Sequence, residues 1–168
     1  MAKAKNPEGE KSMESYRHSL AHLLAAAVLE LYPATKRAIG PAIENGFYYD
    51  FEFKEPISDE NLREIEKKMR QLLVSWDKFE RKESSKEEAN KEFKDNPYKL
   101  ELIDEFSKEG KNLTLYKSGN YVDLCKGNHV DSAKEIKSDS FKLTHTAGAY
   151  WRGDAKNAQL TRIYGVAF

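Results

Sequence analysis

Apolar side chains recur every three or four positions along two stretches of the chain, which predicts two amphipathic helices. The first covers residues 13–32 and ends at Pro33, because proline cannot continue a helix. The second covers residues 58–76, where the Ser58 side chain can cap the first turn. We expect the apolar stripe of the first helix to pack on the core. This stripe consists of Met13, Tyr16, Leu20, Leu24, Ala27 and Leu31.

Runs rich in β-branched and aromatic residues predict strands, and two pairs of these runs are joined by short connections at residues 44–46 and 118–120, the first of which contains the hairpin signal Asn45-Gly46. Strands are expected over residues 37–43, 47–53, 78–83, 113–117, 121–124, 141–146 and 162–166. Further helices are expected over residues 85–95 and 98–108. Helices that alternate with antiparallel hairpins predict an α+β fold, a two-layer sandwich of helices packed on an antiparallel sheet.

The composition narrows the class of protein. Hydrophobic residues make up 39% of the 168 positions and charged residues 33%, which excludes collagen-like and wholly disordered chains. The single cysteine, Cys125, excludes an intramolecular disulfide and fits a reducing cytoplasm. No apolar run approaches the roughly 20 residues of a membrane span. We therefore expect residues 1–12 to form a flexible tail and residues 13–168 to form one cytoplasmic domain.

The charge balance limits how a nucleic acid could bind. Lys and Arg together number 28, as do Asp and Glu, so the net charge is zero. Proteins that bind nucleic acid irrespective of sequence normally carry a basic excess. We therefore expect any RNA partner to be bound at a limited site and not by an overall positive charge of the protein.

Two histidines mark the first helix as a candidate site. His18 and His22 are four residues apart, so their side chains project from the same face, opposite the apolar stripe. Ala21, Ala25 and Ala26 share that second face, which indicates that it is covered as well. The pair could form the wall of a pocket, or it could be two solvent-exposed or hydrogen-bonded histidines.

Cys125 and His129 form a second pair, directly after the strand that ends at Leu124. Together with His18 and His22 they could hold zinc, since three imidazoles and a thiolate make a tetrahedral site. They could equally form a metal-free hydrolytic pocket in which a histidine activates water. A third interpretation is that the Cys125 thiolate is a nucleophile, but no group that would orient it is evident.

Several motifs resemble the editing domain of bacterial-type threonyl-tRNA synthetase, the second additional domain related to that of alanyl-tRNA synthetase. The two histidine-containing motifs occur in both families, whereas two aromatic motifs are typical of the threonyl enzymes. Lys126 and Asn128 depart from the Arg and Pro usual in that family. The motifs are His18-Ser-Leu-Ala-His22, Gly46-Phe-Tyr-Tyr-Asp50, Asp123-Leu-Cys-Lys-Gly-Asn-His129 and Ala147-Gly-Ala-Tyr-Trp-Arg-Gly-Asp154.

The resemblance implies a function. A synthetase for threonine discriminates poorly against serine, which is smaller by one methyl group, and a second hydrolytic site corrects the error. The domain would hydrolyse seryl-tRNA(Thr), with the 3′ end of that tRNA and the remainder of the synthetase as partners. His18 would activate water and Lys99 would assist at the oxyanion. The substrate-binding residues would be His22, Tyr49, Asp123, Cys125 and His129.

Two alternatives remain open. The first is a zinc-dependent, free-standing deacylase of the alanyl-editing type, with His18, His22, Cys125 and His129 as ligands. The second is a non-catalytic module that docks tRNA. The threonyl-type resemblance implies a site without a cofactor. Because neither a ligase domain nor the small N-terminal domain is recognisable, we expect a fragment of a synthetase or, as the second choice, a free-standing editing protein.

Overall fold

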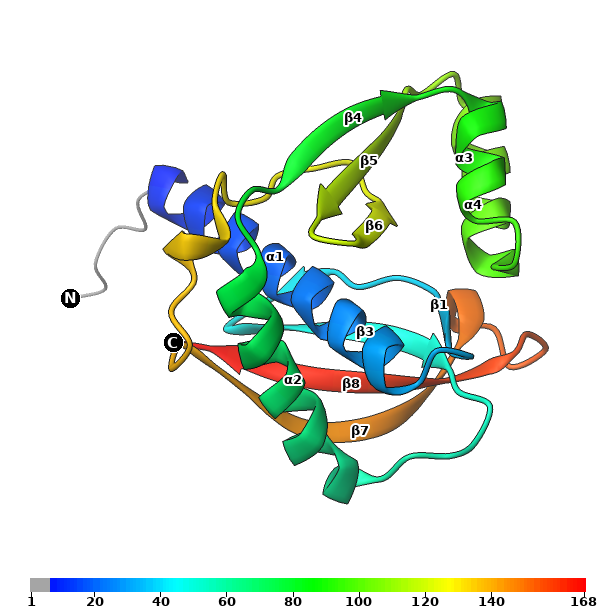
Figure 1. Cartoon of the computed structure of the whole chain (residues 1–168). Coiled ribbons are helices and arrows are strands. Elements are labelled where there is room, and N and C mark those ends of the chain that lie inside the picture. Colours follow the sequence, from blue (N-terminus) through cyan, green and yellow to red (C-terminus); the bar gives the residue numbers. More distant parts are fainter. Residues whose placement is uncertain (1–6) are drawn as a thin grey trace.

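The computed structural model describes residues 7–168, and the side chains from residue 13 onward (Figure 1). The first helix, α1, spans Pro7–Leu31. It begins earlier than residue 13, so residues 7–12 of the expected tail belong to the helix, while residues 1–6 lie outside the described residues. Proline at a helix start is favourable, because its missing N–H would have no partner in the first turn. Between residues 7 and 168 no helix is long and apolar enough to cross a membrane.

A five-stranded antiparallel sheet has the strand order β1-β3-β8-β7, and β2 also pairs with β3. The predicted strand over residues 37–43 is split in two around Pro41, which has no N–H to donate to a ladder. The first predicted hairpin is confirmed, since Ile43 pairs with Gly46 and Asn45 adopts a φ of 62°. The strands of this sheet are β1 (Lys36–Arg37), β2 (Ala42–Ile43), β3 (Gly46–Glu52), β7 (Phe141–Tyr150) and β8 (Gln159–Ala167).

A second antiparallel sheet has three strands, β4 (Glu80–Ser84), β5 (Leu113–Ser118) and β6 (Tyr121–Leu124). The helices α3 (Lys86–Glu92) and α4 (Pro97–Lys108) connect β4 to β5. The α+β class and the antiparallel pairing are confirmed. However, the described residues form two sheets, whereas the sequence pattern predicts helices packed on one sheet.

Helix α1 lies between the two sheets (Figure 1). With α2 (Leu62–Ser75), which follows a 3-10 turn at Asp59–Asn61, it covers one face of the five-stranded sheet. The stripe residues Leu20 and Leu24 are fully buried, and so is Ala25 on the opposite face. The opposite face is covered because core residues of the second sheet pack there. The histidines of α1 therefore point into the interior of the protein.

Candidate active site

The predicted site residues converge where α1, α4 and both sheets meet. Except for His129, all of them line one cavity of about 220 Å³. His129 joins the group through Cys125, whose Sγ lies 3.3 Å from its Nε2. The contributing residues are His18 and His22 on α1, Tyr49 on β3, Lys99 on α4, Asp123 on β6, and Cys125 and His129 in the following loop.

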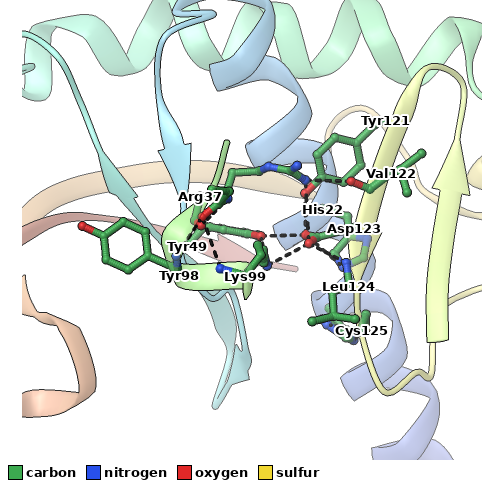
Figure 2. A network of polar contacts seen from close by, with 12 residues as sticks. His22, Arg37, Tyr49, Tyr98, Lys99, Tyr121, Val122, Asp123, Leu124 and Cys125 are labelled. Carbon is green, nitrogen blue, oxygen red and sulfur yellow. Dashed lines mark hydrogen bonds and ion pairs between the residues drawn. The ribbon is translucent and has the colours of Figure 1, made fainter. Parts of the chain in front are cut away.

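The carboxylate of Asp123 is the centre of a buried polar network (Figure 2). Its Oδ1 lies 2.8 Å from the Lys99 Nζ and accepts a hydrogen bond from the Leu124 N–H. Its Oδ2 accepts hydrogen bonds from the hydroxyls of Tyr49, at 2.6 Å, and Tyr121. Only 1% of Asp123 is exposed, so each of these donors replaces water that the carboxylate has lost.

Local structure explains how Lys99 reaches this network. Asn96 caps the start of α4, and its Oδ1 accepts hydrogen bonds from the backbone N–H groups of Tyr98 and Lys99. The Asn96 Nδ2 also donates to the carbonyl of Arg37, the last residue of β1, at 2.8 Å. The first turn of α4 is thereby tied to β1, which sets Lys99 at the cavity.

The ionisation of the Lys99–Asp123 pair follows from its surroundings. Burial alone would raise the pKa of the Asp123 carboxyl, but Lys99 and Arg37 hold that pKa well below its usual range. Burial lowers the pKa of Lys99, and Asp123 opposes this shift. The Lys99 Nζ and the Asp123 Oδ1 are in contact, and each favours the charged form of the other. We therefore treat the pair as an ammonium and a carboxylate at neutral pH.

Three imidazoles and a thiol form a second cluster beside the network. The Cys125 Sγ lies 3.3 Å from the Nε2 of both His18 and His129. The His18 and His129 rings are stacked with their centroids 4.3 Å apart, and the His22 ring lies 4.1 Å from that of His129. Gly127 has a φ of 109° and Asn128 a φ of 37°, and this turn brings His129 back to Cys125. A proline at position 128, as in the related motif, could not adopt that positive φ.

Burial keeps this cluster uncharged. It lowers the pKa of His22 from 6.5 to about 3, and it also lowers the pKa values of His18 and His129. It raises the pKa of the Cys125 thiol to about 12. At neutral pH the cluster is therefore three neutral imidazoles and a thiol. A neutral imidazole can accept a proton, as a general base must.

The donor set also fits a zinc ion. One ligand atom from each of His18, His22, Cys125 and His129 lies within 4.8 Å of the others. Bonds of about 2.0–2.3 Å in a tetrahedral site require such atoms to approach to somewhat less than 4 Å. Small side-chain movements would satisfy this geometry, provided that Cys125 gave up its proton.

Sequence reasoning missed three members of the site. Tyr121 lies two residues before Asp123 on β6, so the period of a strand could have placed both side chains on one face. Arg37 lies 3.7 Å from the Asp123 Oδ1 and donates to the Val122 carbonyl. No local pattern distinguishes Arg37 from a surface arginine. Ser19, between the two histidines, is fully buried and contacts His129.

Comparisons with known proteins show which sequences the chain is similar to. Residues 113–164 match the family model described as the threonyl and alanyl tRNA synthetase second additional domain. The chain is 53% identical to a threonine–tRNA ligase of Borrelia garinii over 149 residues, which are 89% of the chain and 25% of that relative. It is 51% identical to the threonine–tRNA ligase of Staphylococcus carnosus over 162 residues, 96% of the chain and 25% of that relative. The chain spans about a quarter of the length of these relatives.

The α+β fold, the paired histidine motifs and the family match define the class: the chain belongs to the second additional domain family of threonyl and alanyl tRNA synthetases. Within this class it is an editing domain of the bacterial threonyl-tRNA synthetase type, as the similarity along nearly the whole chain shows.

Proposed function

We propose that this domain hydrolyses the ester bond between serine and tRNA(Thr), as the proofreading part of a threonyl-tRNA synthetase in the cytoplasm. The observation that carries the proposal is the joint position of neutral imidazoles and a buried ammonium around one cavity. The 3′ end of tRNA(Thr) carrying serine would be the substrate. The remainder of the synthetase would be the partner of the domain.

In the proposed reaction His18 positions a water molecule and accepts its proton. Among the three histidines His22 is 2% exposed, whereas His18 is only half-buried and can meet water from the cavity. The water oxygen attacks the carbonyl carbon of the ester, and the bond to the ribose oxygen breaks. That oxygen takes the proton from His18, which leaves serine and uncharged tRNA. A positioned general base contributes about 10²- to 10⁴-fold to such a step.

Lys99 would stabilise the oxyanion that forms at the carbonyl. An ammonium has three protons. One of them faces the Asp123 Oδ1, and a second is donated to the Tyr49 hydroxyl at 3.0 Å. The third remains available for the substrate. A fixed cation in a buried site needs no reorganisation as the negative charge develops, which is why such groups accelerate acyl transfer.

The remaining predicted residues would shape the pocket. Both oxygens of Asp123 already have donors, so we assign it the positioning of Lys99 and Tyr49. Contact between Asp123 and the amino group of the substrate would require one of these donors to move. His22, Cys125 and His129 would form the wall that holds the aminoacyl group and the terminal adenosine. A cavity of about 220 Å³ suits a small amino acid.

The test is hydrolysis by the purified chain. We expect rapid release of serine from seryl-tRNA(Thr) and little release of threonine from threonyl-tRNA(Thr). His18→Ala should lower the rate by about 10²-fold or more, the contribution of a general base. His145→Ala is the matched control, because this histidine is exposed on β7. Equal rates on the two esters would contradict proofreading, and no hydrolysis of either would favour a module that only docks tRNA.

A zinc-dependent deacylase is the second candidate, because the four donor atoms lie within 4.8 Å of one another. Zinc held by His18, His22, Cys125 and His129 would act as a Lewis acid or would activate water. Four protein ligands would, however, leave no open position for a substrate, as catalytic zinc sites require. Metal-free hydrolysis therefore has better chemical support than zinc-dependent hydrolysis.

A further inference from the structure

The hydroxyl of Ser19 makes three polar contacts inside the protein, where it is fully buried. Its Oγ lies 2.8 Å from the Ser15 carbonyl oxygen, 3.1 Å from the Val130 amide nitrogen and 3.0 Å from the His129 Nδ1. Two of these partners have fixed roles, since a carbonyl oxygen can only accept a hydrogen bond and an amide N–H can only donate one. The role of the imidazole depends on its tautomer.

Proton counting determines that tautomer. A hydroxyl has one proton and two lone pairs. If the proton pointed to His129, the Oγ and the Ser15 carbonyl would be two acceptors 2.8 Å apart with no proton between them, and they would repel each other. The proton therefore lies toward Ser15. One lone pair accepts the Val130 N–H, and the other must accept a proton from the His129 Nδ1.

We propose that Ser19 is a positioning residue that holds His129 in the tautomer with its proton on Nδ1, so that the bare Nε2 accepts the proton of the Cys125 thiol. The Nε2 lies 3.3 Å from the Cys125 Sγ, and that sulfur also accepts the Gly127 N–H at 3.3 Å. The hydrogen bond at the Nδ1 of His129 fixes which ring nitrogen carries the proton, and this determines where the thiol proton goes.

The consequence for the reaction rests on the proposed function. His18 and His129 present their Nε2 atoms to the same sulfur at equal distances of 3.3 Å. While His129 accepts the thiol proton, His18 does not have to, and it remains available to take a proton from water. Without Ser19 the His129 ring can exchange tautomers, and the two histidines compete for the thiol proton.

The first measurement is independent of activity. In protein labelled with ¹⁵N-histidine, long-range ¹H–¹⁵N NMR spectra distinguish an imidazole protonated at Nδ1 from one protonated at Nε2. We expect His129 of the unaltered chain to be the Nδ1–H form at pH 7.5. A His129 ring with its proton on Nε2 would overturn the proposal, whatever the variants do.

The second measurement compares variants. Ser19→Ala should shift His129 toward the Nε2–H form or a mixture, and it should lower kcat on seryl-tRNA(Thr) about tenfold, a part of the 10²- to 10⁴-fold that a general base contributes, because His18 is then only partly available. KM should stay within about twofold, because no substrate contact is removed. Ser19→Thr keeps a hydroxyl and should retain the Nδ1–H form. An unchanged tautomer in Ser19→Ala would also overturn the proposal.

A matched control is available on α2. The Ser75 hydroxyl donates to the backbone carbonyl of Leu72 at 2.8 Å, as the Ser19 hydroxyl does to that of Ser15, but Ser75 is exposed and has no hydrogen bond to a histidine among the described residues. Ser75→Ala should leave the His129 spectrum and the rate unchanged. If all forms fail to hydrolyse the ester while the spectra behave as expected, the proposed function fails and the role of Ser19 stands.

Discussion

Lys99 and Asp123 form an ion pair inside the protein, with the Nζ and Oδ1 atoms 2.8 Å apart and side chains that are 3% and 2% exposed. The pair joins α4 to β6, the two elements that bring Lys99 and Asp123 to the cavity. Its burial makes it both a chemical group of the cavity and a structural contact. Removing Lys99 takes away the cation nearest to the buried carboxylate and leaves only Arg37, which lies 3.7 Å from the Asp123 Oδ1.

Replacing Lys99 should therefore lower stability as well as activity. Lys99→Met removes the charge with little change in length, and we expect the free energy of unfolding to fall by about 3–5 kcal/mol. Urea denaturation measures this change. The double variant Lys99→Met/Asp123→Asn should recover part of the loss, because the buried carboxylate that lost its nearest cation is then neutral as well. Equal stability of the single and double variants would contradict this account.

A small residue at position 40 is required by Tyr49. A Cβ added to Gly40 would lie 2.1 Å from the Tyr49 Cδ2, and Tyr49 is packed too tightly to yield. We expect Gly40→Ala to cost about 1–3 kcal/mol, as overpacking typically does. It should also lower the rate, because the Tyr49 hydroxyl would move away from Asp123. The midpoint of thermal unfolding and the hydrolysis rate measure the two effects.

Gly148→Ala is the control for that prediction. Its added Cβ meets only the end of the Gln159 side chain, at 2.9 Å, which can rotate away. Stability and rate should be nearly unchanged in this variant. If Gly148→Ala were as damaging as Gly40→Ala, the specific contact with Tyr49 would not be the cause.

The stability of the metal-free protein should fall as the pH is lowered through the histidine range. Burial lowers the pKa of His22 to about 3, whereas it is about 6.5 in an unfolded chain. Between these values the unfolded chain binds the additional proton, so stability is full above pH 6.5 and is lost as the pH falls toward 3. The slope should reach about 1.4 kcal/mol per pH unit for each such histidine. Urea denaturation between pH 7.5 and 5, with a chelator present, measures it.

An exposed histidine supplies the comparison for the pH experiment. His145→Gln alters the outer face of the five-stranded sheet and should leave the pH dependence intact. A free energy of unfolding that stays constant from pH 7.5 to 5 would show that His22 is not held neutral by burial.

Metal removal separates the two proposed chemistries. We expect a chelator to leave hydrolysis unchanged and added zinc to inhibit it, because zinc would occupy the lone pairs of His18, His22 and His129. The rate and the zinc content of the purified protein are measured together. Stoichiometric zinc, loss of activity on chelation and its return with zinc would instead establish the zinc-dependent deacylase.

Helices, strands and turns were predictable where the residues that specify them are neighbours in the sequence. The hairpin before β3 depends on residues only a few positions apart, and it is present, with Glu44 and Asn45 as its turn residues. The division into two sheets was not predictable, because strand pairing between distant segments leaves no trace in periodicity. The start of α1 at Pro7 was missed because no apolar stripe extends over residues 7–12.

The same distinction applies to the site. His18 and His22 were evident because a four-residue spacing places both on one helix face. Lys99 has no such pattern and was singled out only by resemblance to a family. Arg37 was missed altogether, since its burial against Asp123 depends on the docking of β1 beside β6. Long-range contacts decide the charge and exposure of such groups.

The contact between His18 and Cys125 joins residues 107 positions apart in the chain. Closing so long a loop is entropically unfavourable until the intervening segments have folded, so the pocket belongs to the late features of assembly, as does the pairing of Gly46 on β3 with Val166 on β8. In a chain emerging from a ribosome, α1 and the β3 segment precede the Cys125 loop, whereas the β8 partner of β3 follows it. Partial opening of the three-stranded sheet would likewise dismantle the pocket while β3, β7 and β8 remained paired.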